Sequence, residues 1–138
     1  MSVRPARPED APRMGAILSD WIDATPWMPR LHTRAEDVAF CASLVPRAHV
    51  SGKVDGFIAL DGEAIPALYV ARPARRQGHG RALLDHAKAR ADRLSLWTFA
   101  ANREARAFYA AEGFVETART GGENDEGLPD VRLEWRRA

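Results

Sequence analysis

The chain has 138 residues, of which 46% are hydrophobic and 28% are charged. Its 20 basic and 19 acidic residues leave a formal charge of +1, which excludes a general attraction for nucleic acid or for an anionic membrane. The single cysteine, Cys41, excludes an internal disulfide and a cysteine zinc cluster, and we expect it to be a buried structural thiol. With no apolar run near the ~20 residues of a membrane span, we expect a cytoplasmic protein with one domain over residues 1–138.

The first third of the chain predicts one short strand and two helices. Residues 3–6 read as the strand, and the proline and two acids at 8–10 favour a helix start. Apolar residues at helical spacing over 14–22 continue this helix, and the prolines within 25–29 end it. A capping-box pattern opens a second helix over residues 33–46.

The middle of the chain predicts a strand hairpin. A turn at 52–53 precedes a strand over 54–60, and a hairpin turn at 61–63 leads to a strand over 64–70. Pro66 lies inside this last strand and cannot donate a ladder hydrogen bond, so we expect a bulge or a sheet edge there.

The last third alternates helices and strands. Residues 80–94 carry one apolar stripe and predict a helix. Asn102 has the character of a helix N-cap, and Gly113 of the glycine that ends the same helix. The expected strands are residues 95–100, 114–117 and 131–135, with a polar, glycine-rich loop over 118–129. The sum is a mixed sheet with helices, which places the chain in the α/β or α+β class.

The segment that joins strand 64–70 to the next helix predicts an anion site. A helix start offers free backbone N–H groups and the positive end of the macrodipole, and Gly78 and Gly80 let a phosphate approach the backbone. Four arginines concentrate positive charge there: Arg72, Arg75, Arg76 and Arg81. A pyrophosphate is the natural ligand, and a tight turn with solvated arginines is the alternative. The Arg-Ala pair after Gly80 excludes a P-loop, and Leu83 excludes a dinucleotide fingerprint.

Two blocks of residues resemble a known family. Residues 75–80, Arg-Arg-Gln-Gly-His-Gly, have the Arg/Gln-x-x-Gly-x-Gly/Ala pattern of GNAT N-acetyltransferases. Residues 102–114 resemble the Asn-x-x-Ala-x-x-Phe-Tyr-x-x-x-Gly-Phe block of the same family. The resemblance covers about residues 54–115. It implies the GNAT fold: a mixed, mostly antiparallel sheet with helices on both faces, in which the parallel strands 64–70 and 95–100 splay apart.

The resemblance also implies acetyl-CoA as the cofactor, with its pantetheine arm between the splayed strands. Backbone groups of 68–70 would pair with this arm, amides of 77–81 would hold the pyrophosphate, and Asn102 would line the cofactor side. Tyr109 would point at the sulfur and donate a proton to the departing thiolate; the alternative is an aromatic filler beside Phe108. The cofactor residues implied in this way are Leu68, Tyr69, Val70, Arg75, Arg76, Gln77, Gly78, His79, Gly80, Arg81 and Asn102.

No general base is assigned. The strand 64–70 contains no carboxylate, and Asp61 and Glu63 read as solvated turn residues. The alternatives for deprotonating the amine are water, His32, His49, Tyr69 or an acid of the C-terminal loop.

The acceptor is expected to enter opposite the cofactor, between the first helices and the last loop. Trp27, His32 and Glu126 are the candidate substrate residues, because aromatic rings and acids suit a cationic amine. Core packing and a solvated loop are the alternatives for these segments. No histidine spacing indicates a metal site, and we expect His86 at the surface.

We therefore expect an N-acetyltransferase that acts on a primary amine of a small molecule. A protein or peptide acetyltransferase and a non-catalytic acyl-CoA sensor are the alternatives. We expect no nucleic-acid or membrane partner. A homodimer is compatible with the resemblance, since dimers are frequent in the family.

Overall fold

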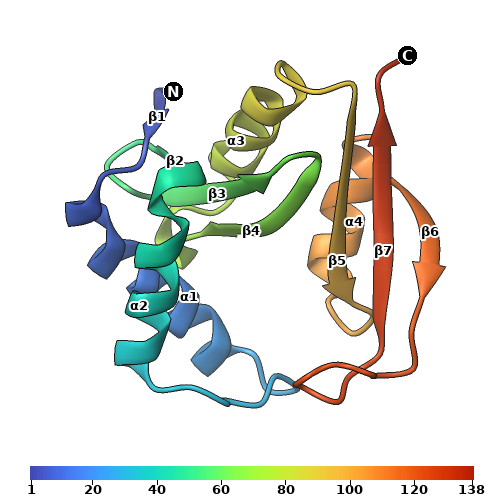
Figure 1. The fold of residues 1–138 in the computed structure, drawn as a ribbon, viewed down its shortest axis with the longest axis horizontal. Coiled ribbons are helices and arrows are strands. Elements are labelled where there is room, and N and C mark those ends of the chain that lie inside the picture. Colours follow the sequence, from blue (N-terminus) through green and yellow to red (C-terminus); the bar gives the residue numbers. More distant parts are fainter.

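The computed structural model describes residues 1–138 and contains one seven-stranded sheet with the order β1-β2-β3-β4-β5-β7-β6 (Figure 1). The strands are β1 (Val3–Pro5), β2 (Ala48–Ser51), β3 (Gly56–Asp61), β4 (Ala64–Val70), β5 (Arg93–Phe99), β6 (Val115–Arg119) and β7 (Asp130–Arg136). The helices are α1 (Ala11–Ala24), α2 (Arg34–Leu44), α3 (His79–Lys88) and α4 (Arg103–Ala111). Only β4 and β5 pair in parallel, which confirms the mixed, mostly antiparallel sheet. None of the four helices has the length and apolar character that crossing a bilayer requires.

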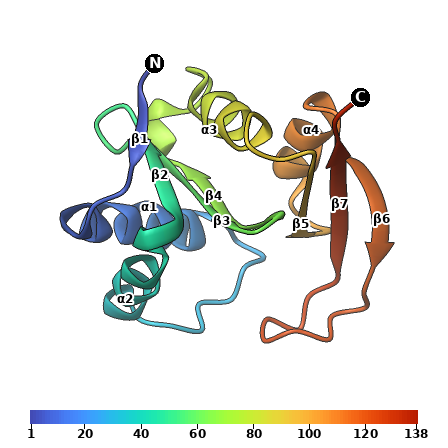
Figure 2. The same ribbon diagram turned by 45° about the horizontal axis from the view of Figure 1, so that its top comes forward.

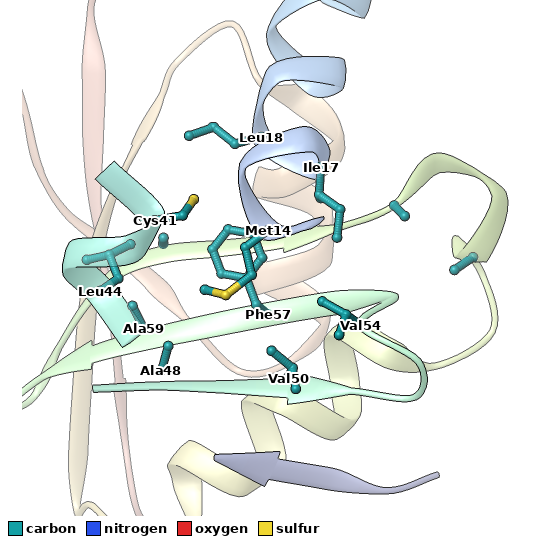
Figure 3. Close-up of a cluster of buried hydrophobic side chains, with 13 residues drawn as sticks. Met14, Ile17, Leu18, Cys41, Leu44, Ala48, Val50, Val54, Phe57 and Ala59 are labelled. Atoms are coloured by element: carbon teal, nitrogen blue, oxygen red, sulfur yellow. The ribbon is translucent and has the colours of Figure 1, made fainter. Parts of the chain in front are cut away.

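The first hydrophobic core lies between the helices α1 and α2 and the strands β2 to β4 (Figure 3). Met14 from α1 and Phe57 from β3 are fully buried at its centre, and burying such a side chain stabilises the fold by roughly 1.5–3 kcal/mol. Cys41 is buried in the same core, and burial raises the pKa of its thiol to about 11. This confirms the expectation of a structural thiol.

The second core lies on the other side of the sheet, under α3 and α4. Leu83 and Leu84 of α3 are fully buried, as are Leu94 of β5 and Val131 of β7. The two cores lie on opposite faces of one sheet, and β4 and β5 form the seam between its two halves (Figure 2). The second core spans both halves, because it also contains Ile58 of β3 and Ile65 of β4.

Helix α3 is shorter than its apolar stripe predicts. It ends at Lys88 instead of residue 94, because Leu94 belongs to β5 and pairs with Trp135 of β7. The backbone N–H of Arg137 donates to the carbonyl of Asp92 at 2.8 Å, which holds the turn before β5 against the end of β7. Some of the apolar residues at helical spacing thus belong to the helix and others to the strand, and both groups are buried in the same core.

The central strands separate where the sequence predicts an irregularity. The β3–β4 register shifts between Ala59 and Asp61, which leaves an extra β4 residue beside Pro66, so the predicted bulge is confirmed. Strands β4 and β5 pair only at Ala64 and Ser95. Beyond that point the two strands diverge, and a cleft opens between their carboxyl ends.

Candidate active site

The loop that leads into α3 is a concave row of free backbone donors. The backbone N–H groups of residues 76–81 have no hydrogen-bond partner in the protein. Arg76 and Gly78 take positive φ angles of 63° and 90°, the left-handed conformation that occurs in anion-binding nests of backbone amides. Such a nest of amides at a helix N-terminus binds anionic oxygens. The free amides of 76–81 are therefore compatible with the pyrophosphate cradle that the motif implies.

Gly80 and two arginines complete the surroundings of these free amides. A Cβ on Gly80 would lie 3.3 Å from the ring of Phe108, so this position has little room for any side chain. Arg75 lies 4.0 Å from Glu104, and Arg81 lies 3.9 Å from Glu112. Both guanidinium groups remain partly exposed beside the free amides, so they can meet phosphate charge.

The cradle is attached to the sheet through His79, the first residue of α3. Its ring is buried, and Nδ1 lies 2.9 Å from Oγ of Ser51, the last residue of β2. On the other side Nε2 lies 3.9 Å from Asp55 of the β2–β3 turn. These contacts fix the start of α3 against the turn and make His79 an anchor of the loop.

A cleft of about 540 Å³ extends from this cradle between β4 and β5. Its β4 wall includes Leu68, Tyr69 and Val70. Arg75, Arg76, Gly78, His79, Gly80 and Arg81 line its anion end, and Asn102 and Tyr109 line it from the α4 side. The structure therefore brings together every predicted cofactor residue except Gln77. The exposed side chain of Gln77 turns back to the carbonyl of Pro73, so only its backbone amide belongs to the cradle.

Helix α4 is built to present Tyr109. The side chain of Asn102 accepts a hydrogen bond from the amide of Ala105 at 3.1 Å and caps the helix start. At the other end Gly113 has φ +93°, and the amides of Gly113 and Phe114 close the helix on Ala110 and Tyr109. These bonds form a Schellman motif, so both ends of the helix are fixed as the sequence predicts.

Tyr109 is buried except for its edge on the cleft, and its ring packs edge-on between Phe108 and Phe114. Burial, and then the nearby Tyr69, raise the pKa of the Tyr109 hydroxyl above its ordinary range. A hydroxyl with a raised pKa keeps its proton at neutral pH. Both predicted roles are compatible with this geometry, because the ring fills the core while the hydroxyl side faces the cleft.

The acceptor side of the cleft is aromatic. Trp21 packs against Trp27 and Tyr69, with ring centroids 5.9 and 5.5 Å apart, and Trp27 packs against Phe99 of β5 at 5.8 Å. Arg30 fixes the segment that carries Trp27, because its guanidinium donates to Asp37 at 3.0 Å and to Asp23 at 2.7 Å. Trp27 thus closes the aromatic wall without lining the cleft itself.

The other candidate residues do not line the cleft. Glu126 contributes, after burial and Cys41, to raising the pKa of Tyr69 to about 12, but it is not among the residues of the cleft wall. His32 is exposed outside the cleft, 3.9 Å from Glu36. His49 also lies outside it, since its ring packs against His86 at 4.0 Å.

The expectation that His86 lies at the surface is only partly correct, because the residue is half-buried. Its Nε2 atom is buried without a hydrogen-bond partner, because the ring packs between α3 and β2 against His49. Burial, and then His49 and Arg90, lower the pKa of His86 to about 4. The polar neighbours of His86 along the helix gave no sign of this packing.

The cleft wall formed by β5 was not predicted from the sequence. Leu96, Trp97, Thr98 and Phe99 all line the cleft. The alternation of these residues indicates a half-buried strand, but only the splaying of β5 from β4 turns that strand into a cleft wall.

The residues fit the chemistry of a coenzyme A thioester. The free amides of 76–81 with Arg75 and Arg81 suit a pyrophosphate, and the diverging strands leave an apolar slot beyond it. Tyr109 lies along this slot and offers a protonated hydroxyl.

Comparisons with known proteins agree with this geometry. Residues 36–116 match the acetyltransferase (GNAT) domain. The chain is 28% identical to the Escherichia coli peptidyl-lysine N-acetyltransferase YiaC, over 96% of this chain and 95% of YiaC. It is 30% identical to the E. coli peptidyl-lysine N-acetyltransferase YjaB, over 87% and 86% of the two chains.

Solved structures show the same fold. The solution structure of apo YjaB superposes with a TM-score of 0.80, covering 99% of this chain and 98% of YjaB at 28% identity. The structure of Salmonella typhimurium yncA with acetyl-CoA superposes with a TM-score of 0.73 at 18% identity, covering 100% and 94% of the chains.

Proposed function

The chain belongs to the GNAT family of acetyltransferases and uses acetyl-CoA, and we propose that it transfers the acetyl group to the side-chain amine of lysine in a peptide or protein. The observation that carries the proposal is the cleft itself, which has free amides at one end and Tyr109 and an aromatic wall at the other. Lysine as acceptor is supported by the activity for which YiaC and YjaB are named.

The residues divide the work along the cleft. Bound acetyl-CoA supplies a thioester whose carbonyl carbon is open to attack by a neutral amine. Amides of 76–81 hold the diphosphate, while backbone groups of 68–70 orient the arm. The Oη atom of Tyr109 holds the proton that a thiolate leaving group requires, an arrangement that typically contributes 10²- to 10⁴-fold in rate. Because the cleft takes residues from both halves of the sheet, we propose that 1–138 act as one domain.

The acceptor wall suits a lysine side chain. Rings of Trp21, Tyr69 and Phe99 can cover its aliphatic stem and face its ammonium group. The C-terminal loop that carries Glu126 is acidic, and its negative charge would attract the ammonium. A small-molecule amine, the acceptor expected from the sequence, is the second candidate because these rings would also enclose a free alkylammonium.

A substrate panel tests the proposal. Thiol release from acetyl-CoA is measured with lysine peptides blocked at their N-termini, with polyamines, and with free lysine. We expect kcat/KM for the peptides to exceed that for every small amine by at least about tenfold. Faster reaction of a small amine would establish the second candidate, and coenzyme binding without turnover on any amine would indicate a sensor.

A further inference from the structure

One face of the sheet formed by β5, β7 and β6 carries no helix. Antiparallel pairing sets the residues of each face, because cross-strand partners point to the same side. Leu94, Leu96 and Thr98 pair with Trp135, Leu133 and Val131 and face the core under α4. The pairs on the opposite face are Arg93 with Arg136, Ser95 with Glu134, Trp97 with Arg132, and Phe99 with Asp130. Figure 1 shows α4 behind these strands and no helix in front of them.

This open face is basic from its centre to the end where Arg93 pairs with Arg136. Glu134 is its only central carboxylate and is 8% exposed. Arg132 donates to Glu134 at 2.9 Å and Arg136 at 2.6 Å, while Arg93 lies 4.0 Å away. Arg132 and then Arg136 lower the pKa of Glu134 to about 2, so this carboxylate stays charged and neutralises one of the three arginines. The face keeps positive charge, carried mostly by Arg93 and Arg136, which are 49% and 67% exposed.

The basic face continues into the acceptor side of the cleft. Trp97 is 49% exposed beside Arg132 and also lines the cleft. Phe99 follows two residues later on the same face and meets the aromatic wall at Trp27. At this end the charge reverses, because Asp130 lies opposite Phe99 and the acidic loop of 120–129 follows. One strip of sheet therefore runs from an acidic cleft mouth to a basic, aromatic surface.

We propose that this strip binds the segment of a substrate peptide next to the acetylated lysine, and that it selects peptides with acidic residues there. The proposal rests on the lysine-acetylating function above. The acidic end would receive the lysine ammonium, Trp97 would pack on the peptide, and Arg93 and Arg136 would pair with carboxylates. At a rise of roughly 3.3 Å per residue, Arg132 lies about 7 Å from Phe99 along the strand, and the Arg93–Arg136 pair about 20 Å. An extended peptide would thus carry its acidic residues two to six positions from the lysine.

Peptides that differ only in flanking charge test this. One set carries Glu at positions two to six on one side of a single lysine, and a second set carries Gln at the same positions. In a third set the lysine is replaced by an analogue that cannot be acetylated. The ratio of kcat/KM for the Glu and Gln peptides is measured for the wild type and for the Arg93→Gln/Arg136→Gln double variant. Arg47→Gln is the matched control, since this arginine is equally exposed but lies after α2, paired with Asp61.

The wild type and Arg47→Gln should favour the Glu peptide by roughly three- to tenfold, the size expected for two exposed ion pairs. The double variant should lose this ratio, and 0.5 M salt should reduce it in the wild type. Equal rates on Glu and Gln peptides in the wild type would overturn the inference while leaving lysine acetylation intact. Reaction with small amines but with no peptide would overturn the proposed function instead. A dimer that Trp97→Ser disperses in sedimentation would also overturn the inference, because the face would then be covered by a second copy.

Discussion

Tyr109 packs like a core residue and also lines the cleft. Its ring has the aromatic neighbours Phe108 and Phe114, which is the environment of a core residue. Its hydroxyl side lies along the cleft and titrates above its ordinary pKa, mainly because of burial. A phenol that remains protonated at neutral pH can donate a proton but cannot serve as a base there. Packing and acid catalysis are therefore separable at this residue, because only the second needs the oxygen.

Replacing Tyr109 by Phe separates them. Tyr109→Phe keeps the ring between its neighbours, so the free energy of unfolding should change by less than about 1.5 kcal/mol. Turnover should fall by about 10²-fold or more, since a positioned general acid contributes that much. The dissociation constant of acetyl-CoA, measured by calorimetry, should remain nearly unchanged. Equal turnover of the two proteins would remove Tyr109 from the mechanism.

Gly78 is a second residue whose conformation carries function. Its φ of +90° sets the path of the loop that carries the free amides of 76–81, and an L side chain rarely adopts that angle. Gly78→Ala should weaken acetyl-CoA binding by about tenfold or more, because the cradle must change shape to relieve the strain. Gly62→Ala is the matched control: Gly62 has φ +61° in an open turn, so the variant should lose similar stability, about 1 kcal/mol, without losing affinity. Equal affinity of the two variants would show that the cradle does not depend on this angle.

At the scale of the element, α3 is attached to the sheet at both ends by histidine. His79 at its start bonds to Ser51 of β2, and His86 in its last turn packs on His49 of the same strand. The two contacts differ in chemistry. The His79 ring has a hydrogen-bond partner, whereas the buried nitrogens of His49 and His86 have none. The second contact therefore favours neutral rings.

This predicts a pH dependence of stability. In the unfolded chain a histidine titrates near pH 6.5, whereas in the folded protein burial, His49 and Arg90 lower the pKa of His86 to about 4. Below pH 6.5 the histidine binds a proton in the unfolded chain but remains neutral in the folded protein. The contribution of His86 to the free energy of unfolding is therefore fully present above pH 6.5 and decreases as the pH falls toward 4. The loss should amount to about 1–2 kcal/mol, allowing for partial exposure of the ring.

Urea unfolding between pH 7.5 and 5 measures this loss. His86→Gln should reduce the slope of the profile in that window, because glutamine does not titrate. His49 keeps part of the slope, since burial and Arg90 also lower its pKa. Carboxylates with lowered pKa values, such as Asp10 and Glu134, lose their contribution at lower pH. A wild-type profile as flat as that of the variant would contradict the prediction.

Local signals predicted the elements well where they act within one turn or one strand. The Thr33 and Asn102 caps, the Gly113 stop and the bulge at Pro66 are confirmed, because each depends on backbone chemistry close in sequence. The predicted end of α3 was wrong, because Leu94 is buried in the same core but belongs to strand β5. The cleft wall at Trp97 and the burial of His86 depend on contacts between distant segments, which no local pattern contains.

At the scale of the whole molecule, strand pairing in the sheet is weakest between β4 and β5. The first core joins α1 and α2 to β2–β4, and the second joins α3 and α4 to β5 and β7 and also contains Ile58 of β3 and Ile65 of β4, so side-chain packing crosses this seam. In the backbone, β4 and β5 share one register pair, Ala64 with Ser95. The cleft occupies the place where further ladder hydrogen bonds would otherwise form. A ligand bound there contacts both halves and acts as a missing strand between them.

Acetyl-CoA should therefore stabilise the whole fold. At a concentration 100 times the dissociation constant, binding to the folded state alone adds about 2.7 kcal/mol, which raises the melting temperature of a chain this size by about 10 °C. Hydrogen exchange should slow most at residues 68–70 and 76–81, the backbone groups that face the cleft from the two sides of the bend after β4. Gly78→Ala should show a smaller shift at the same concentration, while Gly62→Ala should show the full one relative to its own unliganded protein. Slowed exchange confined to 76–81, with 68–70 unchanged, would mean that the diphosphate binds but the arm does not bridge the seam.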